Sequence, residues 1–177
     1  MKKSGLLAFL VLCALSAILS SAVADAPKVQ PAGTSPKQFV QSFYDWYVFR
    51  KNNEADVKGT EIALKQKKQF FDAVLYKGLM EDEAAAAKSP GELVGLDFDP
   101  FVASNGLIYD KYQTAATTTK GTTYMVPIYG IEAGKKTKKP VLEAEVRTVN
   151  GRFVFSNFHY GKSEFPENEN LLSVLSG

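Results

Sequence analysis

The stretch Gly95-Leu96-Asp97-Phe98-Asp99-Pro100-Phe101 separates two parts of the chain that have different hydrophobic patterns. Before it, apolar residues recur at the three- and four-residue spacing of amphipathic helices. After it, they alternate with polar residues, which is the pattern of half-buried strands. A run of helices followed by a run of strands indicates an α+β domain, with helices packed on one face of a curved antiparallel sheet of four or more strands. The stretch is therefore predicted to carry the chain from helices to sheet.

The helical part is predicted to begin with an unusually aromatic helix over 36–51. Ser35 can cap this helix, Pro36 suits its first turn, and Gln38 sits where a capping box places it. One wide face carries Phe39, Val40, Phe43, Tyr44, Trp46 and Tyr47. We interpret this face as core packed against a sheet; alternatively, Tyr44, Trp46 and Tyr47 line a ligand cavity. A second helical segment is expected over 60–88.

The sheet is predicted to contain strands over 111–119, 122–133, 141–149 and 152–160. Asn150-Gly151 is the signal for a two-residue hairpin turn between the last two strands. In the third strand Leu142, Ala144 and Val146 are expected to face the core. The apolar residues of 171–175 indicate a short amphipathic C-terminal helix.

The first 24 residues have the pattern of a cleaved secretory signal peptide. Lys2 and Lys3 precede an apolar run over 5–19, and Ala22-Val23-Ala24 offers a cleavage site before Asp25. The alternative is an uncut anchor, but the run is shorter than the roughly 20 residues of a spanning helix. We expect a periplasmic or secreted protein, with a flexible lead-in over 25–34 and a single α+β domain over 35–177.

Composition narrows the classes of partner. Cys13 is the only cysteine and lies inside the apolar run, so the mature chain is expected to have neither disulfide nor thiol chemistry. Lys2 and Lys3 are two of the 21 basic residues, so cleavage leaves 19 basic residues against 19 acidic ones. A neutral mature chain argues against a nucleic-acid partner. We predict no membrane span after cleavage, because no second long apolar run follows.

Four features of the mature chain occur together: the aromatic helix, the Leu96–Phe101 stretch, Asn150-Gly151-Arg152-Phe153-Val154-Phe155 and a leucine-rich C-terminal tail. In this combination, from about Ser35 to Leu175, the chain resembles the exported bacterial family called domain of unknown function 3828. The resemblance implies a nuclear-transport-factor-2-like, or cystatin-like, cone fold. In that family a Gln-Asp pair often follows the stretch, whereas here Asn105-Gly106 stand in its place. The family has no established activity, so the resemblance implies fold and compartment more than mechanism.

Asp97 and Asp99 would lie on one side of an extended segment, opposite Leu96 and Phe98. The favoured interpretation is that they accept hydrogen bonds from backbone N–H groups and fix the turn before Pro100. Two further interpretations are contact with a cation or ligand, and acid/base chemistry with a raised pKa. An EF-hand calcium loop is excluded, since Phe101 occupies the next alternate position.

His159 is the only histidine. It is expected in phase with Phe153, Phe155 and Asn157, on the concave face of the sheet, where it could act as a general base with an aspartate partner. Asp45, Asp97 and Asp99 are the candidate partners. The sequence has neither a G-x-S-x-G elbow nor a phosphate-binding glycine loop, and we predict no metal site and no cofactor.

The sequence thus favours an exported binding module over an enzyme. It would bind a small ligand or another envelope protein, for example as an inhibitor or immunity protein. The predicted pocket residues are Tyr44, Trp46, Tyr47, Asp97, Asp99, Tyr129, Phe155 and His159. The alternatives are a cone-fold enzyme that uses His159 and Asp99 as acid and base, and a structural accessory of an envelope complex.

Overall fold

The computed structural model describes residues 33–53, 58–89, 91–92, 94–106, 109–161 and 170–177. The predicted signal peptide, its cleavage site and most of the lead-in lie outside these residues. The helices are α1 (Pro36–Asn53), α2 (Gly59–Gln66), the 3₁₀ turn η1 (Lys68–Phe70), α3 (Ala73–Lys88) and α4 (Leu171–Val174). The strands are β1 (Lys111–Thr114), β2 (Thr118–Lys120), β3 (Thr123–Glu132), β4 (Lys135–Lys136), β5 (Leu142–Val149) and β6 (Arg152–Tyr160).

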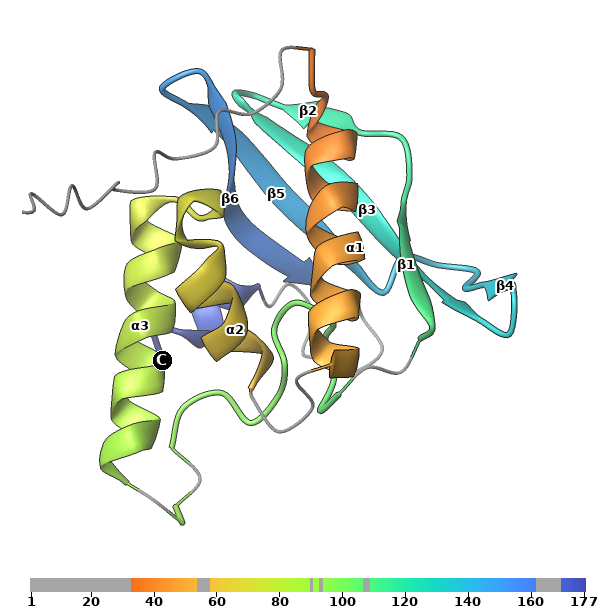
Figure 1. Ribbon diagram of the computed structural model, residues 1–177. Coiled ribbons are helices and arrows are strands. Elements are labelled where there is room, and N and C mark those ends of the chain that lie inside the picture. Colours follow the sequence, from red (N-terminus) through yellow and green to blue (C-terminus); the bar gives the residue numbers. More distant parts are fainter. Residues whose placement is uncertain (1–32, 54–57, 90, 93, 107–108, 162–169) are drawn as a thin grey trace, which may run out of the picture.

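The fold is α+β, with helices followed by a curved antiparallel sheet, as predicted. The strand order is β1-β3-β5-β6, while β2 and β4 pair with β3. Helix α1 crosses one face of this sheet, and α2 and α3 lie beyond α1 on the β6 side (Figure 1). None of the described helices is long and apolar enough to cross a membrane.

Helix α1 begins with the predicted capping box. The Ser35 N–H donates to Gln38 Oε1 at 2.9 Å, and the Gln38 N–H donates to Ser35 Oγ at 3.3 Å. Five residues of its apolar face are buried: Phe39, Val40, Phe43, Tyr44 and Tyr47. They pack on the inner face of the sheet, where β5 contributes the predicted Leu142, Ala144 and Val146. The interpretation of this helix face as core is confirmed.

The prediction of one helical segment over 60–88 is wrong, because α2, η1 and α3 replace it. Phe71 is extended, with φ −107° and ψ 144°, and forms a parallel bridge with Phe155 on β6. The Asp72 N–H donates to the Phe155 carbonyl at 2.9 Å and not to a carbonyl of the preceding turn, so the helix is interrupted here. The Asp72 carboxylate then caps α3 by accepting the Leu75 N–H at 2.8 Å, and it pairs with Arg147 at 2.8 Å. The free energy gained by burying Phe71 at the edge of the sheet is therefore larger than the cost of interrupting the helix.

The strand predicted over 111–119 is also divided, into β1 and β2. Both pair with β3, with Thr114 opposite Ile128 and Thr118 opposite Met125. Between these pairs lies Pro127, which has no N–H for the ladder. The Ala115 N–H still donates to the Pro127 carbonyl at 2.9 Å, so the proline removes one ladder hydrogen bond at the point of interruption.

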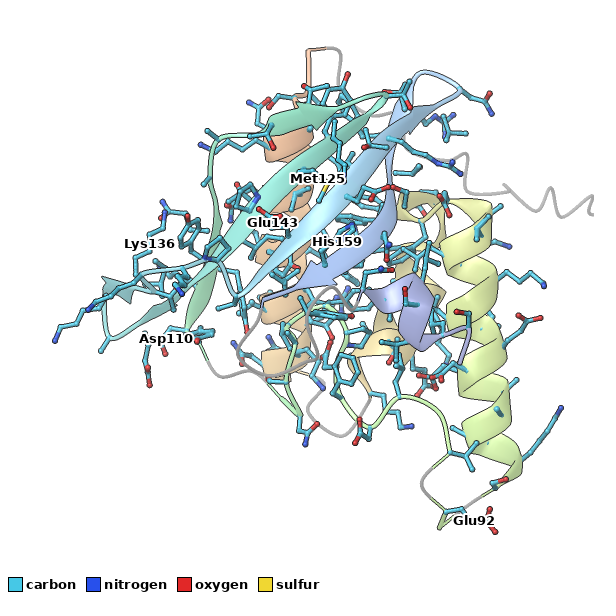
Figure 2. All side chains as sticks on the ribbon, turned by 180° about the vertical axis from the view of Figure 1, so that it is seen from behind. Glu92, Asp110, Met125, Lys136, Glu143 and His159 are labelled. Carbon is cyan, nitrogen blue, oxygen red and sulfur yellow. The ribbon has the colours of Figure 1, made fainter. Side chains whose placement is uncertain are left out.

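A β-bulge in β6 reverses the predicted orientation of its C-terminal half. The Asn150-Gly151 turn forms as predicted, with both residues at positive φ. From this turn Val146 pairs with Phe155, but Glu145 pairs with Asn157, so Ser156 is an extra residue. Phe155 and Phe158 are consequently both fully buried. His159 lies on the outer face of the sheet, which faces the viewer in Figure 2. Its predicted phase with Phe153 and Phe155 is wrong, because a one-residue slip exchanges the faces.

Candidate functional site

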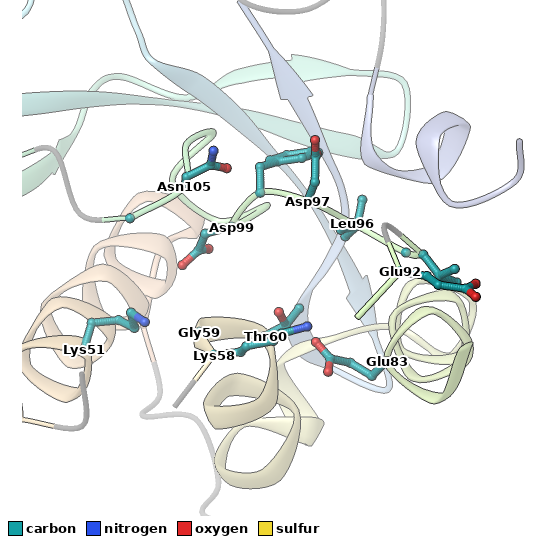
Figure 3. A pocket seen from close by; sticks show the side chains of 14 residues that line it. Lys51, Lys58, Gly59, Thr60, Glu83, Glu92, Leu96, Asp97, Asp99 and Asn105 are labelled. Carbon is teal, nitrogen blue, oxygen red and sulfur yellow. The ribbon is translucent and has the colours of Figure 1, made fainter. Parts of the chain in front are cut away.

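A pocket of about 400 Å³ lies where the stretch 95–101 meets the helices (Figure 3). It is formed by four parts of the chain: the end of α1, the start of α2, the last turns of α3, and the segment that leads to β1. The lining residues are Lys51, Lys58, Gly59, Thr60, Glu83, Glu92, Val94, Gly95, Leu96, Asp97, Phe98, Asp99, Asn105 and Gly106. The stretch that separates helices from strands is thus also one wall of this pocket.

Three tyrosine hydroxyl groups hold Asp99, which lines the pocket, and the two residues that follow it. The Tyr47 hydroxyl donates to the Asp99 carboxylate. The Tyr44 hydroxyl donates to the Phe101 carbonyl at 2.7 Å, and the Tyr160 hydroxyl donates to the Pro100 carbonyl at 3.2 Å. Tyr44 and Tyr47 come from α1 and Tyr160 from β6, so both layers of the domain fix the pocket wall.

Asp99 also organises its own turn. Its Oδ1 accepts the Phe101 N–H at 3.1 Å, and its own N–H donates to the Ser104 carbonyl at 2.8 Å. The interpretation that the carboxylate fixes the turn is confirmed for Asp99. Asp97, two residues earlier, is exposed at the pocket.

Burial raises the pKa of the Asp99 carboxyl group. Hydrogen bonds from the Tyr47 hydroxyl and the Phe101 N–H, together with the positive charge of Lys51, oppose this rise without cancelling it. Burial also holds the pKa of Tyr47 well above its usual value, so the phenol remains a neutral donor. Asp99 therefore keeps its proton to higher pH than an exposed aspartate does, and the pocket wall contains a group that can hold or release a proton.

The Asp99→Asn variant is expected to gain stability relative to the wild type as pH rises. Because the pKa of Asp99 is higher in the folded state, its favourable contribution is complete below the unfolded pKa and is lost as pH rises through the folded pKa. Asparagine keeps both hydrogen bonds, since the Tyr47 hydroxyl can accept as well as donate, and it has no such titration. Urea unfolding of both proteins from pH 4 to pH 8 measures the difference. A difference that is constant, or that increasingly favours the wild type, contradicts the assignment.

The structure does not bring the eight predicted pocket residues together. Asp97 and Asp99 line the pocket. Tyr44 and Tyr47 are fully buried and hold the pocket wall from behind, while Phe155 lies in the core. Trp46 is half-buried beneath Lys67, whose Nζ lies 4.8 Å from the ring centre. Tyr129 points to the outer face of the sheet, where Lys136 Nζ lies 3.9 Å from its ring centre. A ligand contact remains a prediction for each of them.

His159 is paired with a glutamate and not with an aspartate. Its Nε2 lies 2.9 Å from Glu145 Oε2, and the Ser156 hydroxyl donates to Glu145 Oε1 at 2.9 Å. The neighbouring Tyr160 lies on the inner face of the sheet, where its hydroxyl donates to the Pro100 carbonyl. Successive side chains of a strand point to opposite faces, so His159 points away from Asp99. The proposed His159–Asp99 acid/base pair is therefore not formed. Glu145 could be found from sequence only if the bulge at Ser156 were known.

Sequence reasoning missed most of the pocket, including Lys51, Lys58, Gly59 and Glu83. The segment around Lys58 reads only as a polar loop, and Asp99, which lies next to Gly59 in space, is far away in sequence. The part of the chain that the structure describes contains no group of three metal-binding side chains.

The chain matches no family model, no curated protein and no solved structure. The resemblance to domain of unknown function 3828 thus stays a prediction, and the function has to be inferred from the geometry of the site.

Proposed function

We propose that this chain is an exported, non-enzymatic binding module that holds a small polar ligand in the pocket beside Asp97 and Asp99. The observation that carries the proposal is the pocket itself. Its volume of about 400 Å³ falls within the range of small-molecule sites, and it combines apolar walls with a few charged groups. The hydrogen bonds of Tyr44, Tyr47 and Tyr160 support a preformed site, because they join Asp99 and the two residues after it to α1 and β6.

The position of this pocket differs from the one that the sequence suggested. Aromatic side chains fill the space between α1 and the sheet, with Phe43 stacked on Tyr47 and in edge contact with Phe101 and Phe155. We therefore place the ligand at the junction of the helices with the stretch 95–101, and not under the sheet. Helix α1 against a curved antiparallel sheet supports a nuclear-transport-factor-2-like cone. The predicted signal peptide supports a periplasmic or extracellular site of action.

Native mass spectrometry of the exported protein, purified from its own envelope extract, tests the proposal. We expect the wild type to retain a small molecule and the Gly106→Trp variant to lose it. A Cβ on Gly106 meets no atom within 4 Å, so the fold tolerates a larger side chain there while the pocket is filled. Gln113→Trp on the exposed part of β1 is the matched control.

Retention of the same molecule by the Gly106→Trp variant contradicts the proposed site. Recovery of a stoichiometric envelope protein in place of a small molecule would favour the protein-binding version of the module. The surface for such a partner would be the outer face of the sheet, which no described helix covers (Figure 2).

A further inference from the structure

Charges of both signs line the pocket. Lys51 near the end of α1, Lys58 just before α2 and Glu83 on α3 stand on the helical side, while Asp97 and Asp99 stand on the side of the stretch 95–101 (Figure 3). Lys58 is the N-cap residue of α2 and makes no side-chain cap hydrogen bond. The positive end of the α2 dipole therefore adds to the charge of Lys58 on that side.

Two of these charges are available to a ligand. Lys58 and Asp97 are both exposed at the pocket. The ion pairs formed between described residues lie elsewhere: Lys65–Glu61, Lys77–Glu81, Arg147–Asp72 and His159–Glu145. The pocket thus presents Lys58 and Asp97 on opposite walls without joining them to each other.

The two lysines and the four carboxylates of the lining favour a ligand that carries charges of both signs. A compact dianion such as phosphate would meet Lys58 but would be repelled by Asp97, Asp99 and Glu83. A diamine would meet the carboxylates but would offer no partner to the ammonium group of Lys58. A ligand that carries one ammonium and one carboxylate group offers a partner both to Lys58 and to the carboxylates, and Leu96 and Phe98 add apolar lining.

We propose that the ligand of this pocket is a small zwitterion with a free ammonium and a free carboxylate group, as found in an amino acid or a short peptide. The inference rests on the proposed function and specifies the chemistry of its ligand. Asp97 binds the ammonium group, and Lys58 binds the carboxylate group. Charge-assisted hydrogen bonds of this kind are stronger than neutral ones, so both ends of the ligand contribute to recognition.

Isothermal titration calorimetry of the mature protein with capped and uncapped peptides tests this inference. The probes are alanyl-leucine, N-acetyl-alanyl-leucine and alanyl-leucine amide, with leucine and trialanine added to separate amino acids from longer peptides. We expect each cap to weaken binding about tenfold, since a hydrogen bond to a charged group is lost. Equal affinity of the capped and uncapped peptides, or no binding of any probe, overturns the inference.

Two variants assign the ends of the ligand. Asp97→Asn is expected to weaken binding of alanyl-leucine and of its amide, but not of the N-acetylated peptide, which has no ammonium group. Lys58→Gln is expected to weaken binding of alanyl-leucine and of the N-acetylated peptide, but not of the amide. Lys77→Gln is the control, because Lys77 forms an exposed ion pair on α3 and does not line the pocket. Losses that do not depend on the cap contradict the assignment.

The same preparations separate this inference from the proposed function. If Gly106→Trp releases the retained molecule but the zwitterionic probes fail to bind, the pocket is a ligand site and only the ligand class is wrong. If the mass spectra of the wild type and of Gly106→Trp are identical, the proposed function fails as well.

Discussion

Replacing Phe43 with alanine is expected to destabilise the protein by about 4 kcal/mol, which is the usual cost of removing a large aromatic side chain from a core. Phe43 is fully buried, and its ring lies within 6.3 Å of seven other aromatic rings. These rings belong to α1, to the 70–71 segment, to the stretch 95–101 and to β6. Removing Phe43 therefore opens a cavity where all four parts of the fold meet.

Phe49 provides a control on the same helix. Its side chain is 61% exposed, so the Phe49→Ala variant is expected to change the free energy of unfolding by less than about 0.5 kcal/mol. Urea unfolding followed by far-UV circular dichroism measures both variants under the same conditions. Similar effects of the two substitutions would mean that the aromatic face of α1 is not the centre of the core.

Helix α1 and the β5–β6 hairpin could be predicted from the sequence because their signals are local. The Ser35–Gln38 capping box and the aromatic face define α1, and Asn150-Gly151 defines the turn of the hairpin. Each signal is confined to a short segment, and the residues that it predicts to be apolar core are buried in the structure. The helical layer and the antiparallel sheet follow from these elements.

The pairing of Phe71 with β6 and the bulge at Ser156 could not be predicted from the sequence, because both depend on contacts between distant segments. Phe71 leaves the helical path to pair with Phe155, and the Asp72 N–H bonds to that same residue. Asp72 is a recognisable N-cap for α3, and this signal could have located the break. The bulge has no comparable signal, since Phe155 and Phe158 fit either register by composition alone.

The sequence predicted the part of the pocket that contains Asp97 and Asp99, but not the part formed by Lys58 and Gly59. The two aspartates belong to the stretch that separates helices from strands, and their Asp-x-Asp-Pro pattern marks them as candidate site residues. Lys58 and Gly59 precede a short helix and have no distinctive pattern of their own. Only the folded chain shows that Gly59 lies against the Tyr47–Asp99 pair and that its neighbours complete the pocket.

Replacing Gly59 with alanine is expected to destabilise the protein by about 3 kcal/mol, from overpacking and from loss of a charged hydrogen bond. A Cβ on Gly59 would overlap the Tyr47 hydroxyl and the Asp99 carboxylate. The Tyr47 ring is buried and cannot move aside, so the pair must separate. Helix propensity predicts the opposite sign, because alanine within a helix is favoured over glycine by about 1 kcal/mol. Thermal unfolding distinguishes the two, and a variant as stable as the wild type would refute the close packing.

The double variant Gly59→Ala/Tyr47→Phe shows whether the overlap is the cause. Removing the Tyr47 hydroxyl eliminates the closest overlap, so the double variant is expected to lose less stability than the sum of the two single variants. Gly106→Ala, at a pocket glycine whose Cβ meets no atom within 4 Å, controls for the change from glycine to alanine. Additive losses would mean that Gly59 acts through the backbone of α2 and not through the Tyr47–Asp99 pair. Rescue would show that the wall of the pocket depends on the absence of a side chain at this one position.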